Sequence, residues 1–256
     1  MADLAALAAR IIDGTIEVVD LTSPLHAGTP ILQLPPELGQ TVPFQLEEIS
    51  RYDDRGPAWY WNNFRTGEHT GTHLDAPNHW VTGKDLDDVS RIPPQRLIGP
   101  AAVIDKTAEV AKNPDYLLDI PHLEEWQEAN GPLPPKGWLL FRTGWNARGN
   151  DPRAFANADD KGPHTPGVTP EAAAYLAVSD LLGFGVETVG TDAGQAFGFE
   201  PAFPCHEAVL GAGKYGLTQR RNLDRLPVTG SIVIAAPLPI VSGSGSPARV
   251  LALVEK

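Results

Sequence analysis

The chain has 256 residues, of which 42% are hydrophobic and 20% charged, a composition typical of a folded protein with a sizeable core. Its formal net charge is −12 and its pI is about 4.9, so nucleic acid and anionic membranes are excluded as expected partners. The single cysteine, Cys205, excludes an internal disulfide. No apolar run reaches the ~20 residues of a membrane helix, and no signal peptide is evident, so we expect a cytoplasmic protein.

Hydrophobic periodicity predicts helices and strands in alternation, which indicates one mixed α/β domain over residues 1–256. The first helix is expected over residues 4–12, where apolar side chains recur at helical spacing before Gly14. The clearest helix, residues 169–182, opens with Thr169 as N-cap and Pro170 in its first turn. Shorter helical patterns cover residues 116–130 and 206–212. Strands are expected over residues 15–20, 44–49, 59–64, 101–105, 138–142, 186–190, 232–236 and 249–254.

Two long stretches between these elements lack a periodic pattern. Residues 23–43 are rich in Pro and Gly and predict a long loop, and loops of this size inside a compact domain are usually functional. Residues 148–166 are rich in Asp, Gly and Pro and predict an excursion over the surface.

Three histidines and an aspartate lie close together in the pattern His-x3-His-x-Asp-x3-His, formed by His69, His73, Asp75 and His79. A glycine and a proline within this run disfavour a helix, and its polarity does not alternate as in a half-buried strand. We therefore expect an irregular loop that turns these side chains toward one point. Imidazoles and a carboxylate, with positions left for water and substrate, suit a divalent transition metal. The alternative is a polar turn with surface histidines.

The run from His69 to His79 resembles the signature of the cyclase-like metal-dependent hydrolases, a family that includes bacterial kynurenine formamidases and isatin hydrolases. Residues 20–25, 190–192 and 222–227 are also similar to this family, so the resemblance covers nearly the whole chain. The aromatic segment Trp59–Phe64 resembles the isatin hydrolases more than the formamidases. The resemblance implies a swivelling β/β/α fold, with a β-rich barrel-like core and flanking helices, and assembly into homodimers or larger homo-oligomers.

The same resemblance implies that His69, His73 and Asp75 are the metal ligands, and their spacing independently permits this role. It makes His79 a catalytic acid–base and identifies His206 as a second catalytic histidine.

In the two-metal formamidases, a glutamate twelve residues after the second catalytic histidine completes another metal site. Thr218 stands at that position here, and a second cation would lack this anionic ligand. Glu207 is adjacent to His206 and is expected to turn elsewhere. We therefore expect one divalent metal, with Mn²⁺ favoured and Zn²⁺ possible.

The chemistry expected of such a site is amide hydrolysis by metal-activated water. A histidine, with an unperturbed pKa of ~6.5, can take the proton of the attacking water and return it to the leaving nitrogen. His79 is the first choice for this role, with His206 as partner or shuttle.

Trp59, Trp61, Phe64 and Trp80 flank the motif and could sandwich a flat aromatic substrate. The alternative is that they are core residues, since alternation along a strand puts Trp59 and Trp61 on one face. A cyclic amide such as an indole-2,3-dione would fit such a slot, so a small aromatic amide is the expected partner.

Two other activities compete with this interpretation. The nearest is arylformamidase activity on N-formylkynurenine, against which the missing glutamate at position 218 counts. From another class, a non-haem iron oxygenase also uses two histidines and one carboxylate, but it would require O₂ and a reductant or co-substrate. A metal-binding protein without catalysis is a third alternative, disfavoured by the presence of His79 and His206.

Overall fold

The computed structural model describes residues 3–256, so Met1 and Ala2 of the expected domain lie outside it. Seven strands form a closed barrel at the centre of the molecule, because the eight-stranded sheet has an additional pairing between its last strand and β14. An eighth strand, β1 (Ile16–Asp20), pairs with the end of β14. The barrel strands, in the order in which they pair, are β14 (Gly245–Glu255), β13 (Ser231–Pro237), β5 (Ile98–Asp105), β7 (Trp138–Arg142), β11 (Gly183–Val186), β12 (Tyr215–Thr218) and β4 (His73–Asp75).

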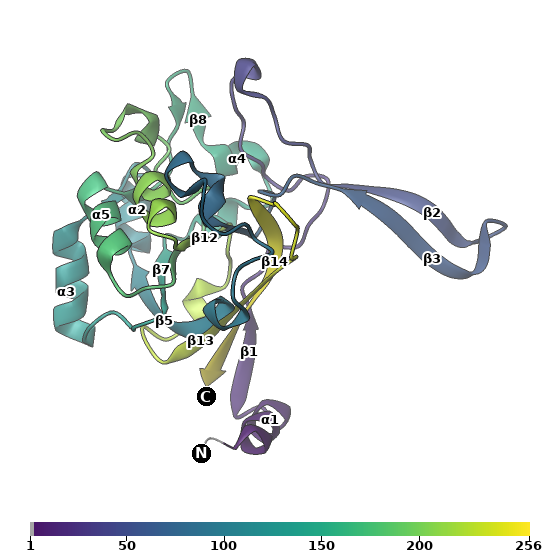
Figure 1. The fold of residues 1–256 in the computed structure, drawn as a ribbon, viewed down its shortest axis with the longest axis horizontal. Coiled ribbons are helices and arrows are strands. Elements are labelled where there is room, and N and C mark those ends of the chain that lie inside the picture. The colour runs from purple at the N-terminus through teal and green to yellow at the C-terminus, as the bar shows by residue number, and fades with distance from the viewer. Residues whose placement is uncertain (1–2) are drawn as a thin grey trace.

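Helices cover one side of this barrel, where α3 and α5 lie beside the strands, and α1 stands apart at the N-terminal end (Figure 1). Helix α5 packs against the π-helical turn His206–Leu210. This turn also contacts β12. Within residues 3–256, no helix combines the length and apolar character needed to cross a membrane. The α-helices are α1 (Leu4–Ile12), α2 (Thr107–Lys112), α3 (Ile120–Asn130), α4 (Pro152–Ala156) and α5 (Pro170–Val178).

Alternation along the strands divides the core into two parts. On β7, Trp138 and Leu140 belong to the cluster that fills the barrel, whereas Leu139 and Phe141 belong to the cluster shared with α3 and α5. All four side chains are buried, which explains why this strand is a continuous apolar run rather than an alternating one. The expected α/β fold with a barrel-like core and flanking helices is confirmed.

A long two-stranded hairpin, β2 (Gln45–Asp53) and β3 (Gly56–Arg65), projects from the body of the molecule (Figure 1). Its strands pair only with each other in the part of the chain that the structure describes, and two irregularities interrupt their register. Both strands are longer than predicted. Three short pairings complete the fold. Strand β6 (Leu117–Leu118) pairs with β10 (Gly167–Val168), and β8 (Ala158–Asp159) pairs with β9 (Gly162–Pro163). The third is an isolated bridge between Thr22 and Arg220.

Several sequence-based boundaries were wrong, and one error concerns the motif itself. Residues 73–75 form β4 instead of irregular loop, with all three residues buried between β12 and β14. Because both faces of β4 are covered, its sequence need not alternate, and the absence of alternation was misleading. The strand expected at 186–190 ends at Val186, and the helix expected to reach 182 ends at Val178. The short buried strand β12 was not predicted.

Candidate active site and metal centre

The histidine motif starts in the turn after β3, runs through β4 and ends in the 3₁₀ turn Pro77–His79. Because β4 pairs with β12 and β14, Asp75 lies opposite Gly216 on one side and Gly245 on the other. A Cβ atom at Gly216 would lie 2.5 Å from Asp75 Oδ2, and one at Gly245 would lie 2.6 Å from His69 Cε1. Both glycines therefore make room for the side chains of the site.

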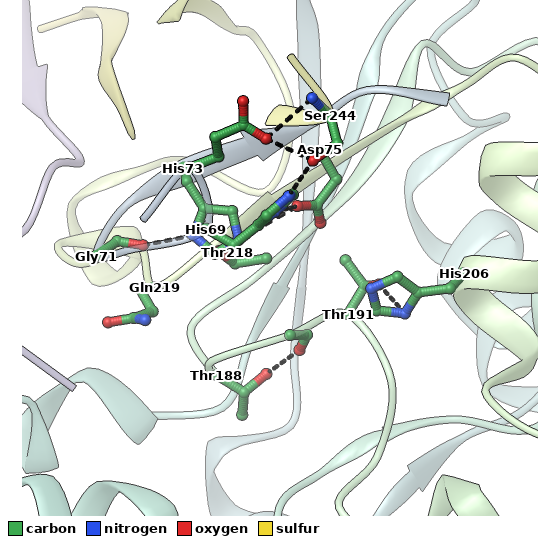
Figure 2. Close-up of polar contacts among 12 residues, drawn as sticks. His69, Gly71, His73, Asp75, Thr188, Thr191, His206, Thr218, Gln219 and Ser244 are labelled. Atoms are coloured by element: carbon green, nitrogen blue, oxygen red, sulfur yellow. Dashed lines mark hydrogen bonds and ion pairs between the residues drawn. The ribbon is translucent and has the colours of Figure 1, made fainter. Parts of the chain in front are cut away.

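Four side chains of the motif converge, and Figure 2 shows three of them, His69, His73 and Asp75. Asp75 is 1% exposed, and its Oδ1 atom lies 2.8 Å from Nδ1 of His69 and 3.2 Å from Nε2 of His73. The His79 ring stacks on the His69 ring with centroids 3.9 Å apart. Possible ligand atoms of His69, Asp75 and His79 all lie within 4.8 Å of one another, which adds His79 to the candidate ligands.

The tautomer of His69 follows from a chain of hydrogen bonds on its outer side. The hydroxyl of Ser244 donates its one proton to Oε2 of Glu68, at a distance of 2.6 Å. It must then accept from Nε2–H of His69, which lies 2.8 Å away. In a neutral imidazole the other nitrogen, Nδ1, is left with a lone pair directed at Asp75.

His73 shows the same arrangement through its other nitrogen. Its Nδ1 atom donates to the carbonyl oxygen of Gly71 at 2.8 Å, which leaves the lone pair on Nε2 facing Asp75. When both imidazoles are neutral, two lone pairs and a carboxylate oxygen face one another, and a divalent cation would bind all three donor atoms. When an imidazole is protonated, the same nitrogen donates to Asp75 instead. The donor set therefore fits a metal.

Electrostatics keep the carboxylate of Asp75 ionised despite its burial. Burial raises its pKa, but the charges and hydrogen bonds of His73 and His69 outweigh this effect and hold the pKa well below its usual value. An ionised carboxylate is the form that binds a cation.

His79 and His206 differ in their preferred protonation states. Burial lowers the pKa of His79 to about 3, so its imidazole is neutral near pH 7. Burial also lowers the pKa of His206, but the hydrogen bond and charge of Asp192 outweigh this and raise it above the ordinary value. The two rings lie 5.6 Å apart, and a proton acceptor next to a proton donor is the arrangement that acid–base catalysis needs.

The position of His206 is fixed by a carboxylate that the sequence analysis did not single out. Asp192 accepts hydrogen bonds from the backbone N–H groups of Cys205 and His206 and also contacts Nδ1 of His206. Thr191 lies beside His206 (Figure 2). Its hydroxyl is 3.4 Å from Nδ1 of His206. Asp192 belongs to the Gly-Thr-Asp stretch that resembles the family, which was the available signal.

Of the four aromatic residues predicted to line the substrate pocket, Trp80 lies beside the catalytic histidine candidates of the same chain. Its ring lies 4.9 Å from that of His206 and 5.7 Å from that of Phe203, a residue missed in the sequence. Its indole N–H donates to Oε2 of Glu207 at 2.9 Å, so this carboxylate oxygen is already engaged. The hydroxyl of Thr218 lies 2.8 Å from Nδ1 of His73, so a neutral side chain stands at this position.

Trp59, Trp61 and Phe64 have a different environment. They lie on the projecting hairpin with 50%, 54% and 59% of their surface exposed. The aromatic partner of Phe64 is Phe44, at a centroid distance of 6.2 Å. In one copy of the chain these rings face solvent, and their assignment to the substrate pocket stays a prediction.

Fold and site define a metal-dependent hydrolase, and the chain belongs to the cyclase family, whose model matches residues 19–193. It is 47% identical over 256 residues to an isatin hydrolase from Roseibium aggregatum, covering 99% of this chain and 97% of that protein. The structure of isatin hydrolase A from Ralstonia solanacearum superposes with a TM-score of 0.97 at 51% identity, covering 100% of this chain and 98% of the other. A kynurenine formamidase from Salinibacter ruber is more distant, at 30% identity over 73% of this chain and 76% of its own length. The predicted nearness to isatin hydrolases is confirmed.

We predict that Glu68→Gln weakens metal binding. An amide at this position can donate to the Ser244 hydroxyl, which is then free to donate to Nε2 of His69 and shift the proton to Nδ1. Loss of such an outer hydrogen bond lowers metal affinity by about 10- to 100-fold, measurable by competition with a chelator. Glu47→Gln, on the exposed surface of the hairpin, is the matched control. Equal affinities in the two variants would contradict the assigned tautomer.

We also predict that Asp192→Asn lowers the pKa of His206 below its ordinary value, because burial then acts without the opposing carboxylate. The wild-type imidazolium should persist above pH 6.5, whereas the variant should lose its proton at lower pH. Histidine NMR signals followed across a pH titration give both values. An unchanged titration of His206 would show that Asp192 does not control this proton.

Proposed function

We propose that this chain hydrolyses the ring amide of isatin-like indole-2,3-diones, giving a 2-aminophenyl-glyoxylate. The observation that carries the proposal is the convergence of His69, His73 and His79 on the buried carboxylate of Asp75. Full-length identity of 47% to an isatin hydrolase supports this substrate class over the linear formamides.

In the reaction, water adds to the amide carbonyl carbon, the C–N bond breaks, and the ring nitrogen leaves as an aromatic amine. His79 is neutral and accepts the proton of the attacking water, and His206, held protonated by Asp192, donates to the leaving nitrogen. A divalent cation held by His69, His73 and Asp75 supplies Lewis-acid chemistry, which polarises the carbonyl and acidifies water. Trp80 provides an aromatic wall beside His206.

One metal per chain is part of the proposal, with Mn²⁺ favoured and Zn²⁺ possible. Thr218 and the engagement of Glu207 with Trp80 support a single cation, because neither position offers a free carboxylate. Carboxylate and water ligands suit Mn²⁺, whereas imidazole ligands suit Zn²⁺. A cytoplasmic location also belongs to the proposal, and the single cysteine is compatible with it.

We further propose a homodimer in which the hairpin of each copy completes the aromatic pocket of the other. Trp59, Trp61 and Phe64 are exposed on an arm that makes no sheet with the barrel in the described residues, and an isolated two-stranded hairpin is marginally stable in water. Because β3 runs directly into the motif that starts at His69, the base of the arm lies beside the metal centre. Twofold symmetry lets two such arms exchange reciprocally.

The activity itself is tested with the metal-loaded protein, incubated with isatin and with N-formylkynurenine in the absence of O₂. We expect ring opening of isatin, followed optically, at a metal content near one per chain. His79→Ala should lower kcat by about 10²–10⁴-fold, because the proton acceptor is lost. Turnover of N-formylkynurenine alone would favour an arylformamidase, and turnover that appears only when O₂ is admitted would favour the iron oxygenase.

If the hairpins are exchanged between the two copies, two inactive variants should restore activity when they form a mixed dimer. One carries Trp59→Ala, Trp61→Ala and Phe64→Ala, and the other carries His73→Ala. In a mixed dimer, the intact metal centre receives the intact hairpin of the other copy, so random mixing should restore roughly a quarter of the wild-type activity. A mixture of His73→Ala and Asp75→Ala is the control and should stay inactive. Failure of the first mixture to recover, with mixed dimers verified by mass, would exclude the exchange.

A further inference from the structure

The two catalytic histidine candidates lie on short turns that pack against each other. His79 ends the 3₁₀ turn Pro77–His79, which leads into a second 3₁₀ turn, Val81–Gly83. His206 begins the π-helical turn His206–Leu210, and both 3₁₀ turns contact it. The placement of one imidazole relative to the other therefore depends on how these turns are joined, because they are far apart in sequence.

The backbones of these turns approach each other closely. A Cβ atom at Gly83 would lie 2.1 Å from the carbonyl oxygen of Pro77 and 3.0 Å from that of Leu210. A Cβ atom at Gly211 would lie 2.8 Å from the side chain of Thr82. Both positions therefore favour glycine, which lets the two backbones pack without an intervening side chain.

Glu207 connects the two turns through two of its oxygen atoms. Its side-chain oxygen Oε2 accepts a hydrogen bond from the indole N–H of Trp80 at 2.9 Å. Its carbonyl oxygen accepts from the hydroxyl of Thr82 at 2.7 Å. Glu207 directly follows His206 in the sequence, and Trp80 directly follows His79. The side-chain contact therefore joins the immediate neighbours of both histidines.

The indole N–H is the one polar group of the Trp80 side chain, so its partner determines which edge of the ring faces Glu207. Three other rings lie near the indole, at centroid distances of 6.3 Å for His79, 4.9 Å for His206 and 5.7 Å for Phe203. The backbone N–H of Glu207 also donates to the carbonyl oxygen of Phe203 at 3.0 Å. Rotation of the indole away from Glu207 would alter all three ring contacts.

Glu207 is not a member of the candidate metal group. Among residues 3–256, the possible ligand atoms that all lie within 4.8 Å of one another belong to His69, Asp75 and His79. The indole N–H of Trp80 can only donate, so Oε2 of Glu207 acts as an acceptor in their contact. An amide oxygen can accept the same hydrogen bond, and the contact therefore requires an acceptor rather than a negative charge.

We propose that Glu207 is a positioning residue for the amide hydrolysis. It orients the Trp80 ring and keeps His79 and His206 in the relative geometry that proton transfer needs. The inference rests on the function proposed above, because it gives a residue that acts through Trp80 a role in that reaction. The rings of the two histidines lie 5.6 Å apart, and an error of about 1 Å in such a placement can cost roughly 10²-fold in rate.

The kinetic test compares variants of the metal-loaded protein at saturating isatin, with kcat expressed per bound metal so that loss of folded protein is not counted. Glu207→Ala should lower kcat by roughly 10- to 100-fold, because Trp80 loses its partner. Glu207→Gln keeps an acceptor at this position and should recover most of that loss. Glu128→Ala, on the exposed surface of α3, is the matched control and should behave as wild type. Equally slow Ala and Gln variants of Glu207, or an Ala variant as fast as the control, would overturn the proposal.

A double-mutant cycle tests whether Glu207 acts through Trp80. Trp80→Phe keeps an aromatic ring but has no N–H to donate. In this background, Glu207→Ala should lower kcat by less than about twofold, because the hydrogen bond is already absent. A full additional loss in the double variant would mean that Glu207 acts by another route, and the positioning role would be wrong.

The contact itself is tested without substrate, which separates this inference from the proposed activity. The six tryptophans give six indole N–H signals in a ¹⁵N NMR spectrum, and the signal missing from Trp80→Phe is that of Trp80. Its proton should exchange slowly with solvent in wild type and Glu207→Gln, and faster in Glu207→Ala. Equal exchange in all three proteins would refute the contact. Wild type that does not hydrolyse isatin, with this exchange pattern intact, would refute the proposed substrate and support the positioning of Trp80.

Discussion

The arrangement of the active centre depends on one buried carboxylate. Removing an ionised Asp75 from water costs several kcal/mol, and His69 and His73, which approach one of its oxygens from two sides, offset this cost when they are protonated. Those imidazoles are in turn oriented from behind, by Ser244 and by the carbonyl of Gly71. In its neutral form each imidazole directs a lone pair toward the carboxylate, which is the arrangement of a candidate ligand set.

Around this set, the chain controls where protons reside. His79 lies against the His69 ring and is kept neutral by burial, whereas His206 is paired with Asp192 and favours its charged form. Trp80 contacts His206 and donates a hydrogen bond to Glu207. A neutral imidazole beside a charged one suits the hydrolysis of an amide, because one proton must be removed and another delivered.

Much of this site was predictable from sequence because its members lie within eleven residues of one another, from His69 to His79. The supporting groups were not, since Ser244 is separated from His69 by 175 positions and meets it only when the barrel closes. β4 was missed for a related reason, because it is buried on both faces and carries no alternation. The hairpin rings were recognised as aromatic residues near the motif, but sequence neighbours on a projecting arm do not share an environment with the loop that follows them.

The short strand β4 is also the piece that completes the ring of seven strands, since it joins β12 to β14. Residues 73–75 must find partners near positions 216 and 246, and pairings of such long sequence separation are slow to form because long loops must close first. The candidate metal ligands His73 and Asp75 therefore lie in the strand that closes the barrel. If they hold a cation, retention of that cation requires a closed barrel.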